Sequence, residues 1–218
     1  MSLHLRNEID TLKQELLKMA GLAESAVARA MQAVETRDDA LAKRVKGDDD
    51  TLDTLEIAID EMGIQLLAKA PLASNLRLIN AAMKISRDLE RVGDEATSIA
   101  RRALHLNVEP PLSLPEELGE LLQCALEMLA QALDAFVNED PVSARAIPPR
   151  DQHADALNKE IHRALISRMV TAPDTITRVV HVLVISKCLE RIADHATNIA
   201  EDVVYLCEAR DIRHMGKA

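Results

Sequence analysis

The most constraining feature of this sequence is a sixteen-residue segment that occurs twice, one hundred residues apart. Residues 85–100 read ISRDLERVGDEATSIA and residues 185–200 read ISKCLERIADHATNIA, and the two copies agree at ten of the sixteen positions. In each copy the apolar residues recur every three or four positions, as on one face of a helix. They are Leu89, Val92, Ala96 and Ile99 in the first copy, and Leu189, Ile192, Ala196 and Ile199 in the second. The chain is therefore predicted to be an internal duplication of a helical unit.

The composition favours helices over sheets. Hydrophobic residues make up 48% of the 218 residues, but aromatic residues make up only 1%. A core of Leu, Ile, Val, Ala and Met packs well between helices, whereas strands draw on aromatic and β-branched side chains. The sequence has no signal peptide and no uninterrupted apolar run of about 18 residues, so we expect a cytoplasmic protein that spans no membrane.

Breaker residues divide the chain into six long predicted helices, three in each half. They span roughly residues 4–46, 49–69 and 75–106 in the first half, and 115–138, 150–169 and 175–210 in the second. The first helix is expected to bend or to be capped again at residues 36–39, and to end at Gly47, which is free to adopt a positive φ. Further capping residues are expected at Asp48–Asp50, Ser74, Asp140 and Asp174.

The order of helices repeats together with the motif. At an offset of 102 residues, 52–55 align with 154–157, and Asp38 aligns with Asp140. A proline-rich segment at residues 109–115 separates the halves, because three prolines in seven residues cannot continue a helix. We therefore predict an all-α fold of two tandem three-helix bundles packed together. The expected domains are residues 1–109 and 116–218, joined by a linker at 110–115.

Acidic pairs with i,i+4 spacing recur in the two halves. They are Asp49 and Asp53, Glu90 and Asp94, Asp151 and Asp155, and Glu190 and Asp194. Like charges one helical turn apart repel each other, so a compensating group is expected. Basic neighbours such as Arg91 and Arg191 could form ion-pair ladders on a solvated face, or the carboxylates could bind Mg²⁺, Mn²⁺ or iron. The start of the second helix in each half need not face the middle of the third, so a shared site in each bundle stays open.

Composition and motifs disfavour several classes of function. A net charge of −10, a pI of about 5.2 and the lack of aromatic residues argue against binding to nucleic acids, and the charge also argues against binding to anionic lipids. Phosphate-loop, dinucleotide-binding and nucleophile-elbow motifs are absent, as is the Glu-x-x-His spacing of di-iron bundles. The cysteines at 124, 188 and 207 are expected to be buried thiols, and His195 a surface or capping residue. We expect no catalytic residues and no organic cofactor; a carboxylate metalloenzyme or metal-binding protein is the alternative.

Three sequence features together resemble the PhoU family. These are the two LER[VI][GA]D segments, the Asp-x-x-x-Asp-x-Leu starts at residues 49 and 151, and the run SNLRLI at residues 74–79. The resemblance covers essentially the whole chain and implies two repeated three-helix bundles. It implies a cytoplasmic negative regulator of phosphate uptake and of the phosphate-starvation response. Such a protein couples the ATPase subunit of the phosphate ABC transporter to a sensor histidine kinase.

The resemblance also implies metal binding at the acidic pairs. Carried over by position, the candidate ligands are Glu90, Asp94, Glu190 and Asp194, with Asp49, Asp53, Asp151 and Asp155 as the matching pairs. The metal would be iron, manganese, magnesium or zinc. The second copy has Ala193 where the first has Gly93, so the two sites are expected to differ in shape. A homodimer is expected as well, with membrane contact only through partner proteins.

Overall fold

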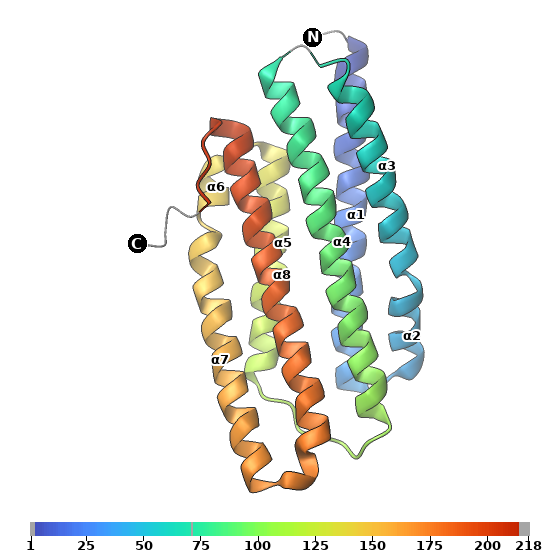
Figure 1. Cartoon of the computed structure of the whole chain (residues 1–218), viewed down its shortest axis with the longest axis vertical. Coiled ribbons are helices and arrows are strands. Elements are labelled where there is room, and N and C mark those ends of the chain that lie inside the picture. Colours follow the sequence, from blue (N-terminus) through green and yellow to red (C-terminus); the bar gives the residue numbers. More distant parts are fainter. Residues whose placement is uncertain (1–2, 71, 214–218) are drawn as a thin grey trace.

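The computed structural model describes residues 3–70 and 72–213 and consists of helices joined by short turns (Figure 1). No strand occurs among the residues described. The elements in order are α1 (Leu3–Thr36), α2 (Asp39–Gly47), α3 (Asp49–Leu67), α4 (Ala73–Asn107), α5 (Glu117–Asn138), α6 (Pro141–Arg145), α7 (Pro148–Thr171), a 3₁₀ turn (Pro173–Thr175) and α8 (Ile176–Glu208). The predicted all-α class is confirmed.

The helices form two bundles of the same design that lie side by side. α1 to α4 form the first bundle and α5 to α8 the second, with α3 and α7 at opposite outer edges (Figure 1). The six predicted helices are present, but the first of each half is interrupted, which yields the short α2 and α6. Two tandem repeats of a three-helix bundle are thus confirmed.

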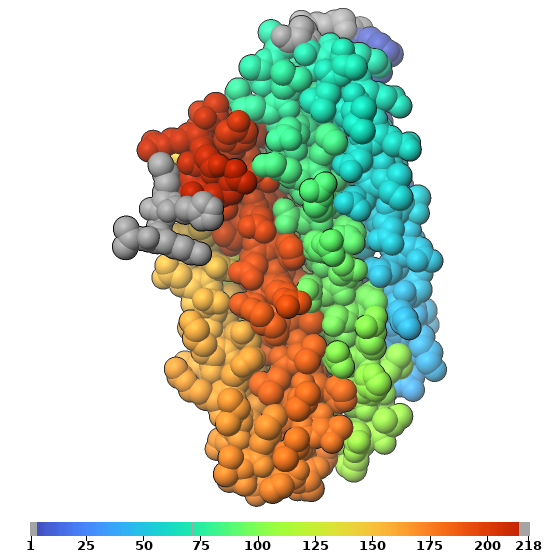
Figure 2. Space-filling model, in the orientation of Figure 1, coloured from blue at the N-terminus to red at the C-terminus, as the bar shows by residue number. Residues whose placement is uncertain are grey.

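The long helices α4 and α8 carry the duplicated motif and form the interface between the bundles (Figures 1 and 2). They run antiparallel, since Lys84 near the start of α4 pairs with Asp202 near the end of α8, while Glu95 pairs with Arg191. The apolar residues of both motif copies are fully buried, as their helical spacing predicted. Among the described residues, no helix is both long enough and apolar enough to cross a membrane.

The interruption of the first helix is built in the same way in both halves. Arg37 and Glu139, which are 102 residues apart, adopt left-handed φ values of 57° and 50°. The residue after each of them donates a backbone hydrogen bond to a carbonyl five positions earlier, at 3.2 Å for Asp38 and 2.9 Å for Asp140. The same two carboxylates then each accept a 2.9 Å hydrogen bond from a backbone N–H of the following helix. The predicted caps at Asp38 and Asp140 are confirmed.

The end of the helix at Gly47 is confirmed, but other predicted details of the helix ends are wrong. Gly47 is the last residue of α2 and does not adopt a positive φ, because α2 runs into α3 through the single residue Asp48 in right-handed conformation. For the same reason the Asp48 side chain makes no capping hydrogen bond. α4 already begins at Ala73, one residue before the expected cap Ser74. Asp174 lies in a 3₁₀ turn, where its carboxylate pairs with Arg178 instead of capping α8.

The linker between α4 and α5 is attached to both bundles. Arg37, at the end of α1, donates hydrogen bonds to the carbonyls of residues 107 and 109, at 2.9 and 2.7 Å. From the second bundle, Arg178 and Arg168 donate to the carbonyls of residues 110 and 113. Prolines have no backbone N–H group, so the linker has few backbone donors that could pair with its carbonyls. Side chains such as these arginines supply the donors instead. Three arginines therefore hold the linker against the two bundles.

Candidate functional site

Helix packing brings the acidic start of α3 against the middle of α4, the juxtaposition that the sequence left open. Leu52 packs directly over Gly93, where an added Cβ would lie only 2.4 Å from Leu52 Cδ1 and 3.5 Å from Asp49 Oδ1. The absence of a side chain at Gly93 thus permits the close approach of α3. The carboxylates of Asp49 and Asp94 consequently lie close enough to repel each other.

The four predicted carboxylates of the first half form one cluster. Burial raises the pKa of Asp49, and the charges of Asp94 and Asp53 raise it further. Burial also raises the pKa of Glu90, again with the charge of Asp94 as the next cause. Arg91 offsets part of this repulsion, with nitrogens 3.0 Å from an Asp94 oxygen and 3.3 Å from a Glu90 oxygen.

An equivalent cluster lies between α7 and α8. Burial, followed by the charges of Glu190 and Asp151, raises the pKa of Asp194 to about 6. Burial and the charges of Asp155 and Glu190 raise the pKa of Asp151. Lys187 forms an ion pair with Glu190, whose side chain is buried. In each bundle the four predicted carboxylates therefore lie within electrostatic range of one another.

The second cluster differs from the first by two unpartnered buried atoms. In the first bundle the Thr97 hydroxyl is a hydrogen-bond partner of Asp49. In the second, Asp151 Oδ1 and Thr197 Oγ1 are both buried and have no hydrogen-bond partner among the residues that the structure describes. Both residues line a groove that also includes Asp194 and the C-terminal Ile212 and Arg213. Buried polar atoms of native proteins normally have partners, so this groove suits a water or a bound cation.

The donor set of the two clusters has the chemistry of a hard cation site. Carboxylate oxygens are the ligands that such ions prefer, and a bound cation would relieve the repulsion that raises the pKa values. As the side chains stand, however, no three His, Cys, Asp or Glu residues within the described ranges converge closely enough to hold a metal ion. Binding would require side chains of each cluster to move closer together.

The predicted ion-pair ladders are present in part. Arg91 and Lys187 pair within their own helices. Arg191 instead reaches across the bundle interface to Glu95 on α4, with 3.2 Å between nitrogen and oxygen. The basic residues around the clusters thus divide between local neutralisation and contact between the bundles.

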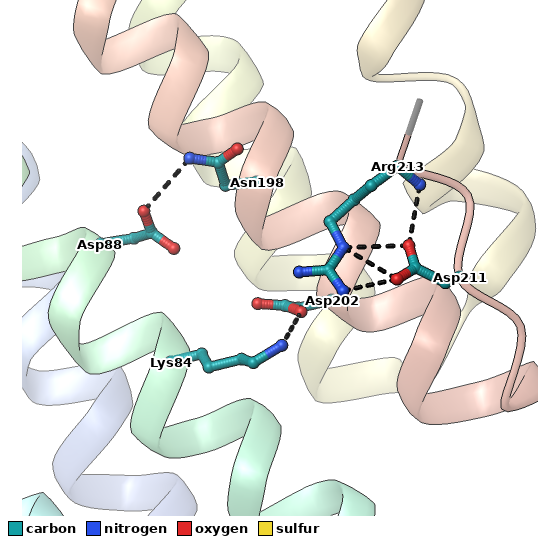
Figure 3. A network of polar contacts seen from close by, with 6 residues as sticks. All are labelled: Lys84, Asp88, Asn198, Asp202, Asp211 and Arg213. Carbon is teal, nitrogen blue, oxygen red and sulfur yellow. Dashed lines mark hydrogen bonds and ion pairs between the residues drawn. The ribbon is translucent and has the colours of Figure 1, made fainter. Parts of the chain in front are cut away.

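His195 belongs to the bundle interface and not to a cap, the solvated surface or the acidic cluster. Its Nδ1 lies 2.8 Å from Asp88 Oδ1, and the Asn198 amide donates to the same oxygen at 3.4 Å. Figure 3 shows Asn198 and Asp88 facing each other beside the ion pair of Lys84 and Asp202. Sequence reasoning missed this polar network.

A signal for that network exists in the differences between the two motif copies. Asp88 in the first copy corresponds to Cys188, and Glu95 corresponds to His195. In the antiparallel pairing Asp88 meets His195, and Cys188 lies against Glu95. The copies therefore diverge where one helix faces the other, because identical residues there could not form complementary pairs. Burial raises the pKa of the Cys188 thiol to about 12, so this cysteine is an unreactive part of the interface.

Comparison with known proteins covers nearly the whole chain. A family model described as the PhoU domain matches twice, at residues 16–103 and 118–203. The chain is 39% identical to the phosphate-specific transport system accessory protein PhoU homolog of Pseudomonas aeruginosa, over 96% of this chain and 87% of the relative. It is 41% identical to the protein of the same description from Caulobacter vibrioides, over 89% of this chain and 85% of the relative.

Two solved structures share the fold over nearly their full lengths. The crystal structure of PhoU from Pseudomonas aeruginosa superposes with a TM-score of 0.89 at 37% identity, covering 94% of this chain and 99% of that one. The crystal structure of the phosphate transport system regulatory protein PhoU from Streptococcus pneumoniae gives a TM-score of 0.90 at 28% identity, covering 95% and 99%. The similarity therefore includes both bundles and their arrangement.

Proposed function

This chain belongs to the PhoU family, and from that premise we propose that it is a regulatory accessory protein of a phosphate-specific transport system. The observation that carries the proposal is the extent of the similarity, which spans both repeats in sequence and in structure. The relatives are described as accessory and regulatory proteins of phosphate transport, and none of those named above is described as an enzyme.

Within this role we propose that the chain couples the ATPase subunit of a phosphate ABC transporter to a sensor histidine kinase. It would act in the cytoplasm as a homodimer, and restrain phosphate uptake and the starvation response while phosphate is plentiful. The shape of the molecule is compatible with two simultaneous partners, because α3 and α7 lie at opposite edges (Figure 1). The membrane would be reached only through these partners.

Deletion of the gene in its own organism tests the regulatory role. In phosphate-replete medium, a reporter driven by a starvation-induced promoter should become active in the deletion strain and fall silent again when the gene is restored. Binding of the purified chain to the purified ATPase subunit and to the kinase's cytoplasmic region should be measurable separately. A reporter that stays silent in the deletion strain, with no binding to either protein, would refute the proposal.

We also propose that the carboxylate clusters bind iron, manganese, magnesium or zinc. The second cluster is the better candidate because one of its carboxylate oxygens, Asp151 Oδ1, is buried without a hydrogen-bond partner in the described part of the chain. Asp151, Asp155, Glu190 and Asp194 would hold the ion there, and Asp49, Asp53, Glu90 and Asp94 in the first cluster. A bound cation would supply the charge that these crowded carboxylates lack, and it would strengthen the contact between adjacent helices.

Metal removal combined with Asp194→Asn tests this proposal. The folded-state pKa of Asp194, about 6, lies above its ordinary value of 3.8, so the proton binds more tightly in the folded state. Ionisation of Asp194 therefore destabilises the fold as pH rises through 6, and the penalty disappears below about pH 4. In chelator, the substitution should raise the free energy of unfolding at pH 7 by roughly 1 kcal/mol after allowance for solvent screening, and should have no effect near pH 4.

With metal present, the wild type should be more stable than D194N, because metal binding stabilises only the wild type. Elemental analysis should show less metal in D194N than in the wild type. The matched control is Asp174→Asn, a carboxylate of the same half whose side chain is 80% exposed and outside the cluster. Equal metal content in the wild type, D194N and D174N would show that the cluster is not the binding site.

A further inference from the structure

The outer helix α3 has an unusual balance of charge. It carries six carboxylates and no basic residue: Asp49, Asp50, Asp53, Glu56, Asp60 and Glu61. None of them forms an ion pair within the part of the chain that the structure describes. Elsewhere in the molecule carboxylates are commonly neutralised, as in the pairs of Lys84 with Asp202 and Arg29 with Asp48. Asp49 is partly buried against α4, whereas Asp50, Asp53 and Glu61 are exposed to solvent.

The same helix exposes a stripe of large apolar side chains. Ile57 is 60% exposed, Ile64 63% and Leu67 37%. Separations of seven and three residues place them on one face of the helix, and Glu61 lies between the two isoleucines on that face. Complete burial of an isoleucine side chain contributes roughly 1.5–3 kcal/mol, so this stripe would gain from being covered.

This face points away from the rest of the molecule. α3 packs against α1, α2 and α4 of its own bundle. It lies along the outer edge of the first bundle, opposite the second bundle (Figures 1 and 2). A helix of another protein could therefore lie along α3 without meeting another part of the described chain on that side.

The equivalent helix of the second repeat shows that the fold does not require this charge. At the offset of 102 residues, Ile64 corresponds to Ile166, which is 54% exposed. Two neighbouring positions differ in charge. The apolar Ile57 corresponds to the basic Lys159, and the acidic Glu61 corresponds to the basic Arg163. Lys159 is paired with Asp155 of its own helix. α7 also exposes Val170, which is 77% exposed, so both outer helices carry exposed apolar residues. The two helices differ in charge, because only α3 is acidic without basic residues.

We propose that the outer face of α3 is a docking surface for a basic amphipathic helix of a partner protein. Its apolar side chains would cover Ile57 and Ile64, and its lysines and arginines would pair with Asp60 and Glu61. Charge complementarity identifies this occupant, because an acidic or neutral helix would leave the carboxylates of α3 uncompensated. The inference rests on the proposed function in that the partner would be a component of the phosphate regulatory system.

A residue swap between the two repeats tests the proposal with little risk to folding. The variant I57K/E61R gives α3 the two residues that α7 has at the same places, and K159I/R163E makes the reverse change in α7. The probe is a fluorescein-labelled 18-residue peptide of lysine and leucine arranged as an amphipathic helix, and its binding is followed by fluorescence anisotropy. Circular dichroism melts confirm that both variants are folded.

I57K/E61R should bind the peptide about tenfold more weakly than the wild type, or more weakly still. K159I/R163E should gain a second binding site, and high salt should weaken each interaction. Wild-type affinity in I57K/E61R would overturn the proposal. A change in oligomeric state on sedimentation, with peptide binding unchanged, would identify the face as a contact between copies of the chain and would also overturn it.

The same variants separate this inference from the proposed function. If the wild type and I57K/E61R bind the purified transporter ATPase and the kinase equally, the proposed function stands and the α3 surface is wrong. If I57K/E61R loses the peptide while neither protein binds the wild type, the α3 surface stands and the proposed partners are wrong.

Discussion

At the residue scale, the two acidic clusters differ through one pair of compensating positions. In the first bundle Leu52 packs on Gly93, and in the second the equivalent positions are Ala154 and Ala193. All four residues are buried. A large residue facing a glycine in one repeat is thus replaced by two alanines in the other. The exchange from Gly93 to Ala193 is tolerated because Leu52 has become Ala154.

A double-mutant cycle tests this compensation. Gly93→Ala alone should destabilise the protein by about 1–3 kcal/mol, because the new Cβ would lie 2.4 Å from Leu52 Cδ1. Leu52→Ala alone should cost about 2–5 kcal/mol through the cavity that it leaves. The double variant should cost clearly less than the sum, since each change removes the problem created by the other. Free energies of unfolding in urea measure all three.

Gly21→Ala is the matched control for this cycle. Gly21 lies within α1, and an added Cβ there would meet no atom within 4 Å. Replacing a helical glycine by alanine in open space should raise stability by up to about 1 kcal/mol. The hypothesis would be wrong if the destabilisation by Gly93→Ala and that by Leu52→Ala simply added in the double variant. It would also be wrong if Gly93→Ala and Gly21→Ala changed stability equally. Either result would show that packing over Gly93 does not limit the approach of α3.

At the element scale, a residue in left-handed conformation interrupts the first helix of each half at equivalent positions. The side chain at this position has a different function in each repeat. Arg37 uses its guanidinium to hold two carbonyls around the start of the linker. The Glu139 side chain, which is half exposed, forms an ion pair with Lys13 at 2.8 Å. The backbone geometry was retained in both copies, whereas the side chains differ in what they contact. Arg37 holds the start of the linker against its own bundle, and Glu139 pairs with Lys13 of the other bundle.

Glycine substitutions at these two positions should therefore have opposite effects. Glu139→Gly should stabilise the protein by up to about 1 kcal/mol, because glycine adopts a positive φ without strain and an exposed ion pair contributes little. Arg37→Gly gains the same relief but loses two hydrogen bonds from a charged donor, so it should be destabilising by about 1–3 kcal/mol. Thermal melts of the two variants measure the difference. If both substitutions changed the melting temperature in the same direction, the result would contradict the role of Arg37 in holding the linker.

At the scale of the whole molecule, the interface of α4 with α8 joins the two bundles and varies along its length. Near one end Lys84 pairs with Asp202. Near the other, the imidazoles of His105 and His181 are stacked with ring centres 5.0 Å apart and planes 7° from parallel. His181 Nδ1 is buried, and no residue in the described ranges is its hydrogen-bond partner. Burial lowers the pKa of His181, and the nearby charges of His105 and Arg102 lower it further.

The interface should therefore lose stability in mild acid. Because the folded-state pKa of His181 lies below its ordinary value of 6.5, the unfolded chain binds the proton first as the pH falls. The contribution of neutral His181 to stability is present above pH 6.5 and decreases below it. His181→Leu should remove the decrease, so the difference in unfolding free energy between variant and wild type should grow from pH 7.5 to pH 5.

His4→Leu provides the comparison, because the His4 side chain is 82% exposed and lies far from the interface in α1. Urea unfolding of both variants across this pH range measures the effect. A wild-type pH profile in H181L would show that the stacked histidines do not sense pH.

The sequence predicted most of what depends on neighbouring residues. Helical periodicity and breaker residues identified the helices, and the offset of 102 residues identified the paired caps at Asp38 and Asp140. The predicted positive φ at Gly47 and the predicted caps at Ser74 and Asp174 were wrong, because the neighbouring elements begin at other residues. A capping side chain can act only at a true helix terminus, and several residues in a turn are suitable candidates.

The sequence by itself determined the class of fold, the duplication and the acidic pairs one helical turn apart, because helix formation and burial patterns follow from spacing along the chain. Only the tertiary structure decided that Asp49 lies against Asp94, that His195 meets Asp88, and that the outer face of α3 stays uncovered. These contacts join residues on separate helices. Their distances depend on how closely and in which register whole helices pack, and no local pattern specifies that register.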